Sequence, residues 1–226
     1  MGRRSDKTED HSATRPAART TPAQSRARRT VESILSAAAE LLGEVGVEQL
    51  STNLVCRRAA MTPPALYRYF PDKYAILSEL ARRLLDAQAE AVFAWVDAGG
   101  LEPSHGEDAV AKAERLQQRL NEITRHALGG VWILRALGAV PRLRDIRIAA
   151  RDEVARHIAA QLSQAYPGAP ESELLRAARL TVELSYAVSE MVLVEPVSEE
   201  PRINQDIAWM VTTHYQRLAR LAVDRS

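Results

Sequence analysis

The 226-residue sequence lacks features on which several large classes of protein depend. Its single cysteine, Cys56, excludes a disulfide framework within one chain and fits a reducing compartment. It contains no apolar run of about 18 residues, so we expect no membrane span. The N-terminus has no apolar segment of the kind that secretory signals carry. We therefore expect a cytoplasmic protein that does not bind membranes.

Signals of catalysis and of metal binding are missing as well. There is no HExxH motif, no glycine-rich phosphate loop and no nucleophile elbow. The five histidines are scattered along the chain without the spacing of a metal site. We accordingly predict no enzyme activity, no cofactor and no metal.

The net charge of +1 conceals an asymmetry between the two ends of the chain. Residues 1–83 contain 14 Lys/Arg and 9 Asp/Glu, whereas residues 84–226 contain 16 and 20. The front of the chain is therefore basic and the remainder acidic. This division favours a polyanionic partner at the N-terminal end alone.

The most informative stretch is STNLVCRRAAMTPPALYRYFPDK, residues 51–73. Ser51 and Thr62 are suitable N-caps for two short helices, and Pro63 suits the first position of the second helix. Asp72 is placed to cap a third helix. Two short helices joined by a brief turn, with a polar and aromatic second helix, are typical of a helix-turn-helix.

These residues resemble the tetracycline-repressor-like (TetR) family of bacterial regulators. The resemblance covers about residues 28–85 and is carried by ALYRYFPDK, by the AAMT turn before it and by the preceding helix. Ala60 stands where the family usually has glycine, the Pro63–Pro64 pair where Lys-Gly is common, and Cys56 where alanine is usual. The resemblance implies a DNA-binding head, a larger domain that encloses a small-molecule effector, and a homodimer formed through the two C-terminal helices.

Hydrophobic periodicity predicts helices throughout and no strand, in a composition poor in aromatics and rich in alanine, leucine and arginine. We expect an all-α fold with a three-helix N-terminal helix-turn-helix domain and a larger helical domain for ligand binding and dimerisation. Residues 1–25 are expected to be a disordered basic arm, 26–72 the DNA-binding domain, and 73–226 the effector-binding and dimerisation domain. Further helices are expected over about 107–128, 131–137, 141–166, 171–194 and 202–223.

If the chain is a DNA-binding protein with this pattern, individual residues can be given expected roles. The resemblance implies backbone phosphate contacts for Asn53, Tyr67, Tyr69 and Lys73. Thr62 and the amides behind it suit a phosphate at a helix N-terminus. Arg68 is able to pair with guanine, whereas Pro63, Pro64 and Ala65 offer only apolar base contacts. Arg28 and Arg29, beside the first helix, are also expected at DNA, while for the rest of the arm a solubilising role is equally open.

The larger domain has candidate residues for an effector pocket and for a dimer interface. The pocket candidates are Phe93, Trp95, His126, Trp132, Arg135, Glu183, Tyr186 and Glu190. The alternative for each is core packing or simple solvent exposure. The helices over 171–194 and 202–223 suit half of an intermolecular four-helix bundle. Its expected interface residues are Leu174, Leu180, Leu184, Met191, Ile207, Met210, Val211, His214 and Leu218.

We predict a ligand-responsive transcriptional regulator, specifically a repressor that binds a palindromic double-stranded DNA operator as a homodimer and is released by a small-molecule effector. One alternative is a helical sensor or adaptor that acts through protein partners. Another is a helical-bundle enzyme that uses Glu183 and Glu190, but seven residues on one helix separate two carboxylates by about 10.5 Å. Cys56 is either a redox sensor or a small buried residue, and the second role is the commoner.

Overall fold

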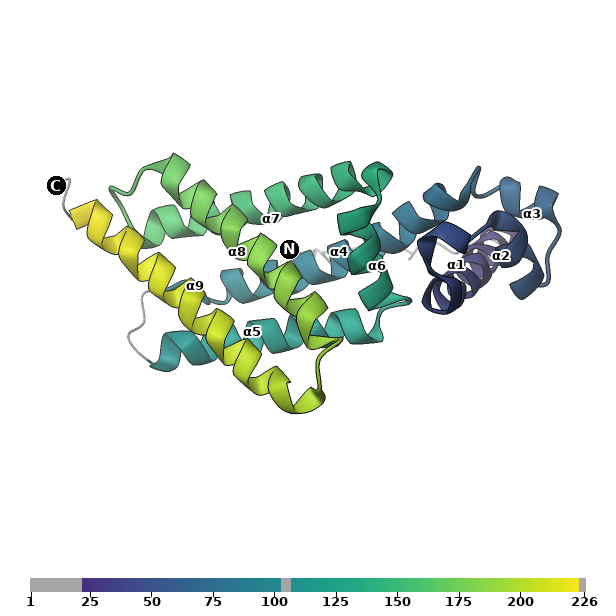
Figure 1. Cartoon of the computed structure of the whole chain (residues 1–226). Coiled ribbons are helices and arrows are strands. Elements are labelled where there is room, and N and C mark those ends of the chain that lie inside the picture. The colour runs from purple at the N-terminus through teal and green to yellow at the C-terminus, as the bar shows by residue number, and fades with distance from the viewer. Residues whose placement is uncertain (1–21, 103–106, 224–226) are drawn as a thin grey trace, which may run out of the picture.

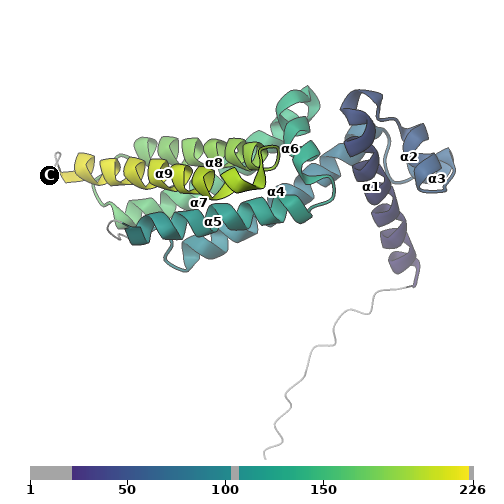
Figure 2. The same ribbon diagram turned by 60° about the horizontal axis from the view of Figure 1, so that its bottom comes forward.

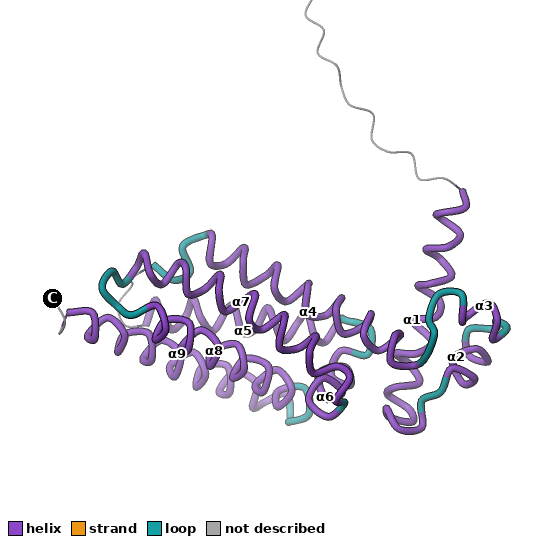
Figure 3. The backbone as a smooth tube through the Cα atoms, turned by 90° about the horizontal axis from the view of Figure 1, so that it is seen from above, coloured by secondary structure: helices purple, strands orange, loops and turns teal. Residues whose placement is uncertain are grey.

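A computed structural model describes residues 22–102 and 107–223 of the chain. Every regular element in these ranges is a helix, and Figure 3 shows none of the described chain as strand. The molecule is elongated, with a small helical head at one end and a bundle of longer helices at the other (Figure 1). The all-α architecture is therefore confirmed.

The head consists of α1 (Pro22–Gln49), α2 (Thr52–Arg58) and α3 (Pro63–Tyr67). The start of α1 at Pro22 makes the last four residues of the expected arm helical, and residues 1–21 lie outside the described ranges. Gly46 interrupts α1 with φ 71°, a left-handed conformation that glycine adopts without strain. After this kink, one short helical turn continues to Gln49.

Local caps and one apolar cluster hold the head together. Ser51 Oγ accepts a hydrogen bond from the Leu54 amide at 3.3 Å, and Asp72 Oδ1 accepts one from the Ala75 amide at 2.9 Å. Leu66 is fully buried in a core that joins α1, α2 and α3 to the first half of the next helix. The predicted caps at these two positions are confirmed.

Helix α4 (Lys73–Asp97) links the head to the bundle (Figure 2). Its first half, with Ile76 and Leu77, is buried in the core of the head. Its second half, with Val92 and Val96, is buried in the core of the bundle. One continuous helix therefore contributes to both cores.

The bundle contains α5 (Glu107–His126), α7 (Arg144–Ala165), α8 (Glu171–Val192) and α9 (Glu200–Val223), with the short 3-10 helices η1 (Pro141–Leu143) and η2 (Val197–Glu199) before α7 and α9. Helices α8 and α9 pack on each other and cover one face of the bundle (Figure 1). Helix α6 (Gly130–Ala139) packs on α1 as well as on α5, α7 and α8. Among the described helices none is long and apolar enough to cross a membrane.

Candidate nucleic-acid interface and effector cavities

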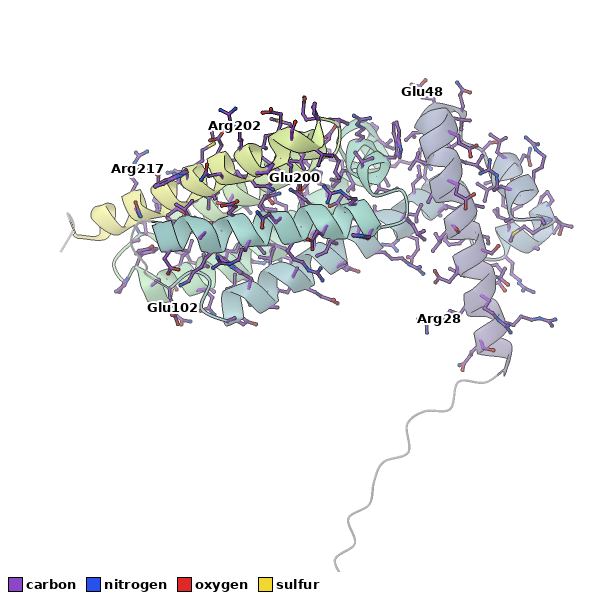
Figure 4. All side chains as sticks on the ribbon, turned by 90° about the horizontal axis from the view of Figure 1, so that it is seen from below. Arg28, Glu48, Glu102, Glu200, Arg202 and Arg217 are labelled. Carbon is purple, nitrogen blue, oxygen red and sulfur yellow. The ribbon has the colours of Figure 1, made fainter. Side chains whose placement is uncertain are left out.

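The surface of α2 and α3 separates core residues from candidate contacts. Leu66 and Phe70 are buried in the core of the head. The candidate DNA contacts are all at least partly exposed: Arg28, Arg29, Asn53, Thr62, Pro63, Pro64, Ala65, Tyr67, Arg68, Tyr69 and Lys73. Figure 4 shows Arg28 near the N-terminal end of α1 and Glu48 near its other end.

Two tyrosines connect elements of this surface. The Tyr67 hydroxyl lies 3.0 Å from Thr52 Oγ1, so the end of α3 is joined to the start of α2. Arg68 Nη2 donates a 2.7 Å hydrogen bond to the Tyr69 hydroxyl, and the guanidinium carbon lies 5.0 Å from the centre of that ring. The hydrogen bond from Arg68 lowers the pKa of Tyr69. Tyr69 also packs against the apolar core of the head.

The expected phosphate site at the start of α3 is corrected by its hydrogen bonds. Pro63 and Pro64 have no amide N–H, and the amides of Ala65 and Leu66 both donate to Thr62 O. The first turn of α3 therefore has no amide free to bind an anion. Thr62 occupies the N-cap position without a side-chain capping bond, so its exposed hydroxyl is the polar group left there.

Two cations of the head, Lys73 and Arg58, are bonded within the protein. Lys73 Nζ donates to Val47 O at 2.9 Å and to Glu48 O at 3.1 Å, and so satisfies carbonyls at the end of α1. Arg58 pairs with Glu40 at 3.0 Å and with Glu44 at 2.6 Å, which holds α2 on α1. At these positions Lys73 and Arg58 stabilise the fold. The ammonium group of Lys73 has three N–H donors, so it can still bind another partner.

Two cavities of about 60 Å³ lie inside the bundle between α4, α5, α7 and α8, and one of them extends to α9. Their walls are mostly apolar. The residues shared by both cavities are Val92, Leu116, Leu120, Ile158, Thr181 and Ser185. The two cavities are therefore neighbours that share one set of walls.

Of the eight pocket candidates, Trp95 and Tyr186 line these cavities. Burial raises the pKa of Tyr186 to about 12, so its phenol is neutral. Glu183 pairs with Arg147 and with Arg151 of α7 instead.

The other five candidates lie outside the cavity walls. Arg135 pairs with Glu190 at 3.4 Å, and its guanidinium lies over the ring of Trp132. His126 is exposed, and its Nδ1 lies 2.8 Å from its own helix at Glu122 O. Phe93 packs against the His157 ring. Because Glu183 and Glu190 each have arginine partners, they do not form the paired carboxylates that an acid–base enzyme requires.

Sequence reasoning missed the polar residues of the bundle interior. Gln88 is 4% exposed and lines one cavity, and Gln117 is 5% exposed and lines the other. Buried Asn121, Thr124 and Ser189 continue the polar groups along α5 and α8. One sequence signal could have revealed these buried polar residues. Gln88 and Thr124 occupy helix positions whose neighbours on the same face are apolar.

The outer face of α8 and α9 is apolar and exposed. Leu180, Leu184 and Met191 share one side of α8, and Met210 of α9 is 61% exposed. Trp209 of α9, which is not among the expected interface residues, is also exposed. In contrast, three of the expected interface residues are buried within the protomer: Leu174, Ile207 and Leu218. Val211 and His214 are partly exposed.

Cys56 is 4% exposed, and burial raises the pKa of its thiol. A thiol with a raised pKa forms little thiolate at neutral pH, which is the reactive form. The arrangement therefore favours a packing role for Cys56 over a redox role.

Comparison with known proteins agrees with this geometry. Residues 34–80 match the family model of bacterial regulatory proteins, tetR family. The chain is 41% identical over 54 residues to the tetracycline repressor protein class C of Escherichia coli, and 42% identical over 52 residues to the class A protein from transposon 1721. These matches cover 24% and 23% of this chain. The aligned part spans about a quarter of the length of each repressor, 25% and 24%.

The fold is shared over a longer stretch. A tetR-family transcriptional regulator from Streptomyces coelicolor superposes with a TM-score of 0.62 at 16% identity, covering 88% of this chain and 90% of that one. GusR of Salmonella enterica gives a TM-score of 0.55 at 21% identity, covering 86% and 96%. The chain thus has a helix-turn-helix head on a helical bundle. The segment over residues 34–80 therefore matches the tetR family model, and the chain as a whole shares its fold with these solved regulators.

Proposed function

We propose that the chain is a transcriptional repressor that binds a near-palindromic DNA operator as a homodimer and releases it when a small molecule occupies the bundle. The observation that carries the DNA part is the exposed surface of α2 and α3. There, Arg68 is held against Tyr69 while its remaining donors face solvent. A guanidinium fixed in this way is suited to the paired acceptors of guanine in a major groove.

The homodimer is supported by the apolar outer face of α8 and α9. Leu184, Met191 and Met210 expose large apolar side chains on neighbouring helices. Contiguous exposed apolar surface of this kind commonly marks an interaction site in a soluble protein. Two such helices from each protomer form a four-helix interface with two-fold symmetry, and that symmetry accounts for a palindromic operator.

Effector release is supported by the position of the cavities beside α4. Ligand binding changes operator affinity only through a difference in affinity for the two conformations of the dimer. Because α4 is buried in both cores, a change in its packing within the bundle is transmitted to the head. This rigid connection is the physical route from effector to operator.

DNA contacts are tested with an operator enriched from random duplexes, by fluorescence anisotropy at several salt concentrations. Arg68→Ala is expected to weaken binding about 10- to 100-fold and to relax sequence preference at one position of each half-site. The Arg28→Ala, Arg29→Ala double variant is expected to weaken all sequences alike and to reduce the salt slope. Arg119→Ala, an exposed arginine of α5, is the control and leaves both quantities unchanged. An unaltered affinity in the first two variants contradicts these contacts.

The interface is tested by sedimentation of the wild type and of Leu184→Arg. A cation placed in each copy of an apolar interface is expected to weaken the dimer at least about 100-fold, because two buried like charges oppose association. Val197→Arg is the matched control, since Val197 is 81% exposed on η2 rather than on the α8 face. A wild type that stays monomeric at micromolar concentration, or a Leu184→Arg variant that stays dimeric, contradicts this interface.

A further inference from the structure

Gln88 has a buried acceptor that the protein itself leaves unused. The side chain is 4% exposed, and Oε1 has no hydrogen-bond partner among the described residues. The residue lines the cavity between α4, α5, α7 and α8. An unsatisfied buried acceptor costs about 1–3 kcal/mol, so a donor that reaches it inside the cavity is bound favourably.

The orientation of the Gln88 amide follows from its neighbours. Thr124 Oγ1 donates its only proton to Leu120 O at 2.8 Å. Toward Gln88, at 2.8 Å, the same oxygen is therefore an acceptor and requires the Nε2 donor. Turning the amide over would require the Thr124 hydroxyl to give up its hydrogen bond to Leu120 O. The unused atom of Gln88 is consequently the carbonyl oxygen.

The other polar groups of the walls are neutral, and several are already occupied. Ser185 donates to Gln117 Oε1 at 2.7 Å, Thr181 donates to Ala177 O at 3.1 Å, and Tyr215 donates to Thr181 at 2.8 Å. Both ends of the Gln117 amide are likewise bonded within the protein. Among the described wall residues of the two cavities none is charged. An ionised ligand would meet no opposite charge there and would lose its hydration.

We propose that the effector is an uncharged, mainly apolar molecule that donates one hydrogen bond, from a hydroxyl or an amide N–H, to Gln88 Oε1. The word effector rests on the proposed function, whereas the binding site rests on the geometry of the cavity alone. Thr124 holds the Gln88 amide in place, and the apolar walls accommodate the body of the ligand. Since Gln88 belongs to α4, the recognising group lies on the helix that continues into the head.

The test compares three small probes of similar size: 1-butanol, methyl propyl ether and butanoate. Binding is measured without DNA by calorimetry and by fluorescence of a Trp132→Phe, Trp209→Phe variant, in which Trp95 at the cavity wall is the remaining tryptophan. The alcohol is expected to bind at least about tenfold more tightly than the ether, which lacks the donor. Butanoate, which has the same chain length and a charge, is expected to bind more weakly still. Equal binding of alcohol and ether, tighter binding of butanoate, or no binding by any probe overturns the proposal.

The Gln88→Leu variant tests whether the preference for the alcohol over the ether depends on Gln88. The variant keeps the apolar cavity and removes the acceptor, so the affinities for alcohol and ether are expected to converge to within about threefold. Gln118→Leu is the control, because the Gln118 amide bonds to Glu114 and is not among the wall residues. A folded Gln88→Leu protein that retains the tenfold preference overturns the assignment. If Gln88→Leu fails to fold, the comparison of the three probes on the wild type still tests the proposed ligand chemistry.

Failure of this inference is distinguishable from failure of the proposed function. A protein that selects an operator and binds none of the probes remains a DNA-binding regulator with a different ligand chemistry. A protein that prefers the alcohol through Gln88 but selects no DNA has the cavity site without the operator. Each result concerns one domain of the molecule, because the ligand measurements contain no DNA.

Discussion

The head and the bundle are both helical, but their buried interiors differ in polarity. The buried core of the head is apolar throughout, with Cys56 as its nearest approach to a polar side chain. In the described chain, the buried polar side chains all belong to the bundle: Gln88, Gln117, Asn121, Thr124, Ser189 and Asn204. An apolar core packed around short helices fixes one surface geometry, whereas polar groups and cavities leave room for a ligand.

Sequence similarity follows the same division. Identity of about 40% is confined to some fifty residues, with the family match over 34–80 in the head. Over the whole fold, identity to the Streptomyces coelicolor regulator falls to 16% although the helices superpose. The bundle fold therefore persists with very different residues, and its pocket chemistry has to be derived from this chain's own side chains.

The largest effect is expected in the core of the head. Leu66→Ala removes a fully buried side chain from tight packing and is expected to cost about 2–5 kcal/mol in urea unfolding. Val92→Ala, at a wall shared by both cavities, removes less apolar volume and is expected to cost about 1.5 kcal/mol. Equal costs for the two variants, or a larger cost at Val92, would break the contrast between a tight head and a loosely packed bundle.

A buried polar pair of the bundle gives the next effect. Thr124→Val preserves shape but leaves the Gln88 Nε2 donor without its partner, at an expected cost of about 1–3 kcal/mol. The Thr124→Val, Gln88→Leu double variant is expected to cost less than the sum of the two single changes, since no donor is then left unpaired. Denaturant titrations of all four proteins measure this coupling. If the costs of the two single changes add strictly in the double variant, Gln88 and Thr124 do not stabilise each other.

An exposed ion pair of the head is expected to make the stability of the fold depend on pH. The hydrogen bond from Arg58 lowers the pKa of Glu44 below its usual value of 4.5. The unfolded chain therefore binds the proton more readily, so the pair stabilises the fold above pH 4.5, and this contribution disappears as pH falls through the lowered pKa. Arg58→Gln is expected to lower the melting temperature at neutral pH, by an amount that shrinks in acid. A difference between the two proteins that grows on acidification is the opposite of this expectation.

The smallest effect concerns the turn between α2 and α3. Ala60 has φ 51°, a left-handed conformation that strains a residue with a Cβ atom. Ala60→Gly is expected to stabilise the protein by about 0.5–1 kcal/mol, and thus to raise the melting temperature by about 1–4 °C. Ala98→Gly, which changes an exposed residue with φ −82°, is the control and brings no such gain. No increase for Ala60→Gly would show that the turn carries little strain.

The sequence is sufficient for features that depend on neighbouring residues. The caps at Ser51 and Asp72, the break at Gly46 and the burial of Phe70 each follow from local chemistry and periodicity. The missing amides at the start of α3 were also readable, because Pro63 and Pro64 are adjacent in the sequence.

Features that join distant segments required the structure. Lys73 bonds to carbonyls 25 and 26 residues away, and Gln88 meets Thr124 across 36 residues. Helix α8 is apolar on more than one face, and periodicity alone does not tell which face belongs to the protomer core. Leu174 is inside and Leu184 outside for reasons of packing rather than of residue type.

The most direct test of the division into a reading head and a dimerising bundle is selection from random DNA duplexes at about physiological salt, carried out in parallel with the wild type and with Leu184→Arg. The wild type is expected to enrich a near-palindrome whose two half-sites match the two-fold axis of the dimer. The variant, with its head intact, is expected to enrich no paired half-sites. Enrichment of no sequence by folded, dimeric wild-type protein, or of the same palindrome by a monomeric variant, would contradict the account.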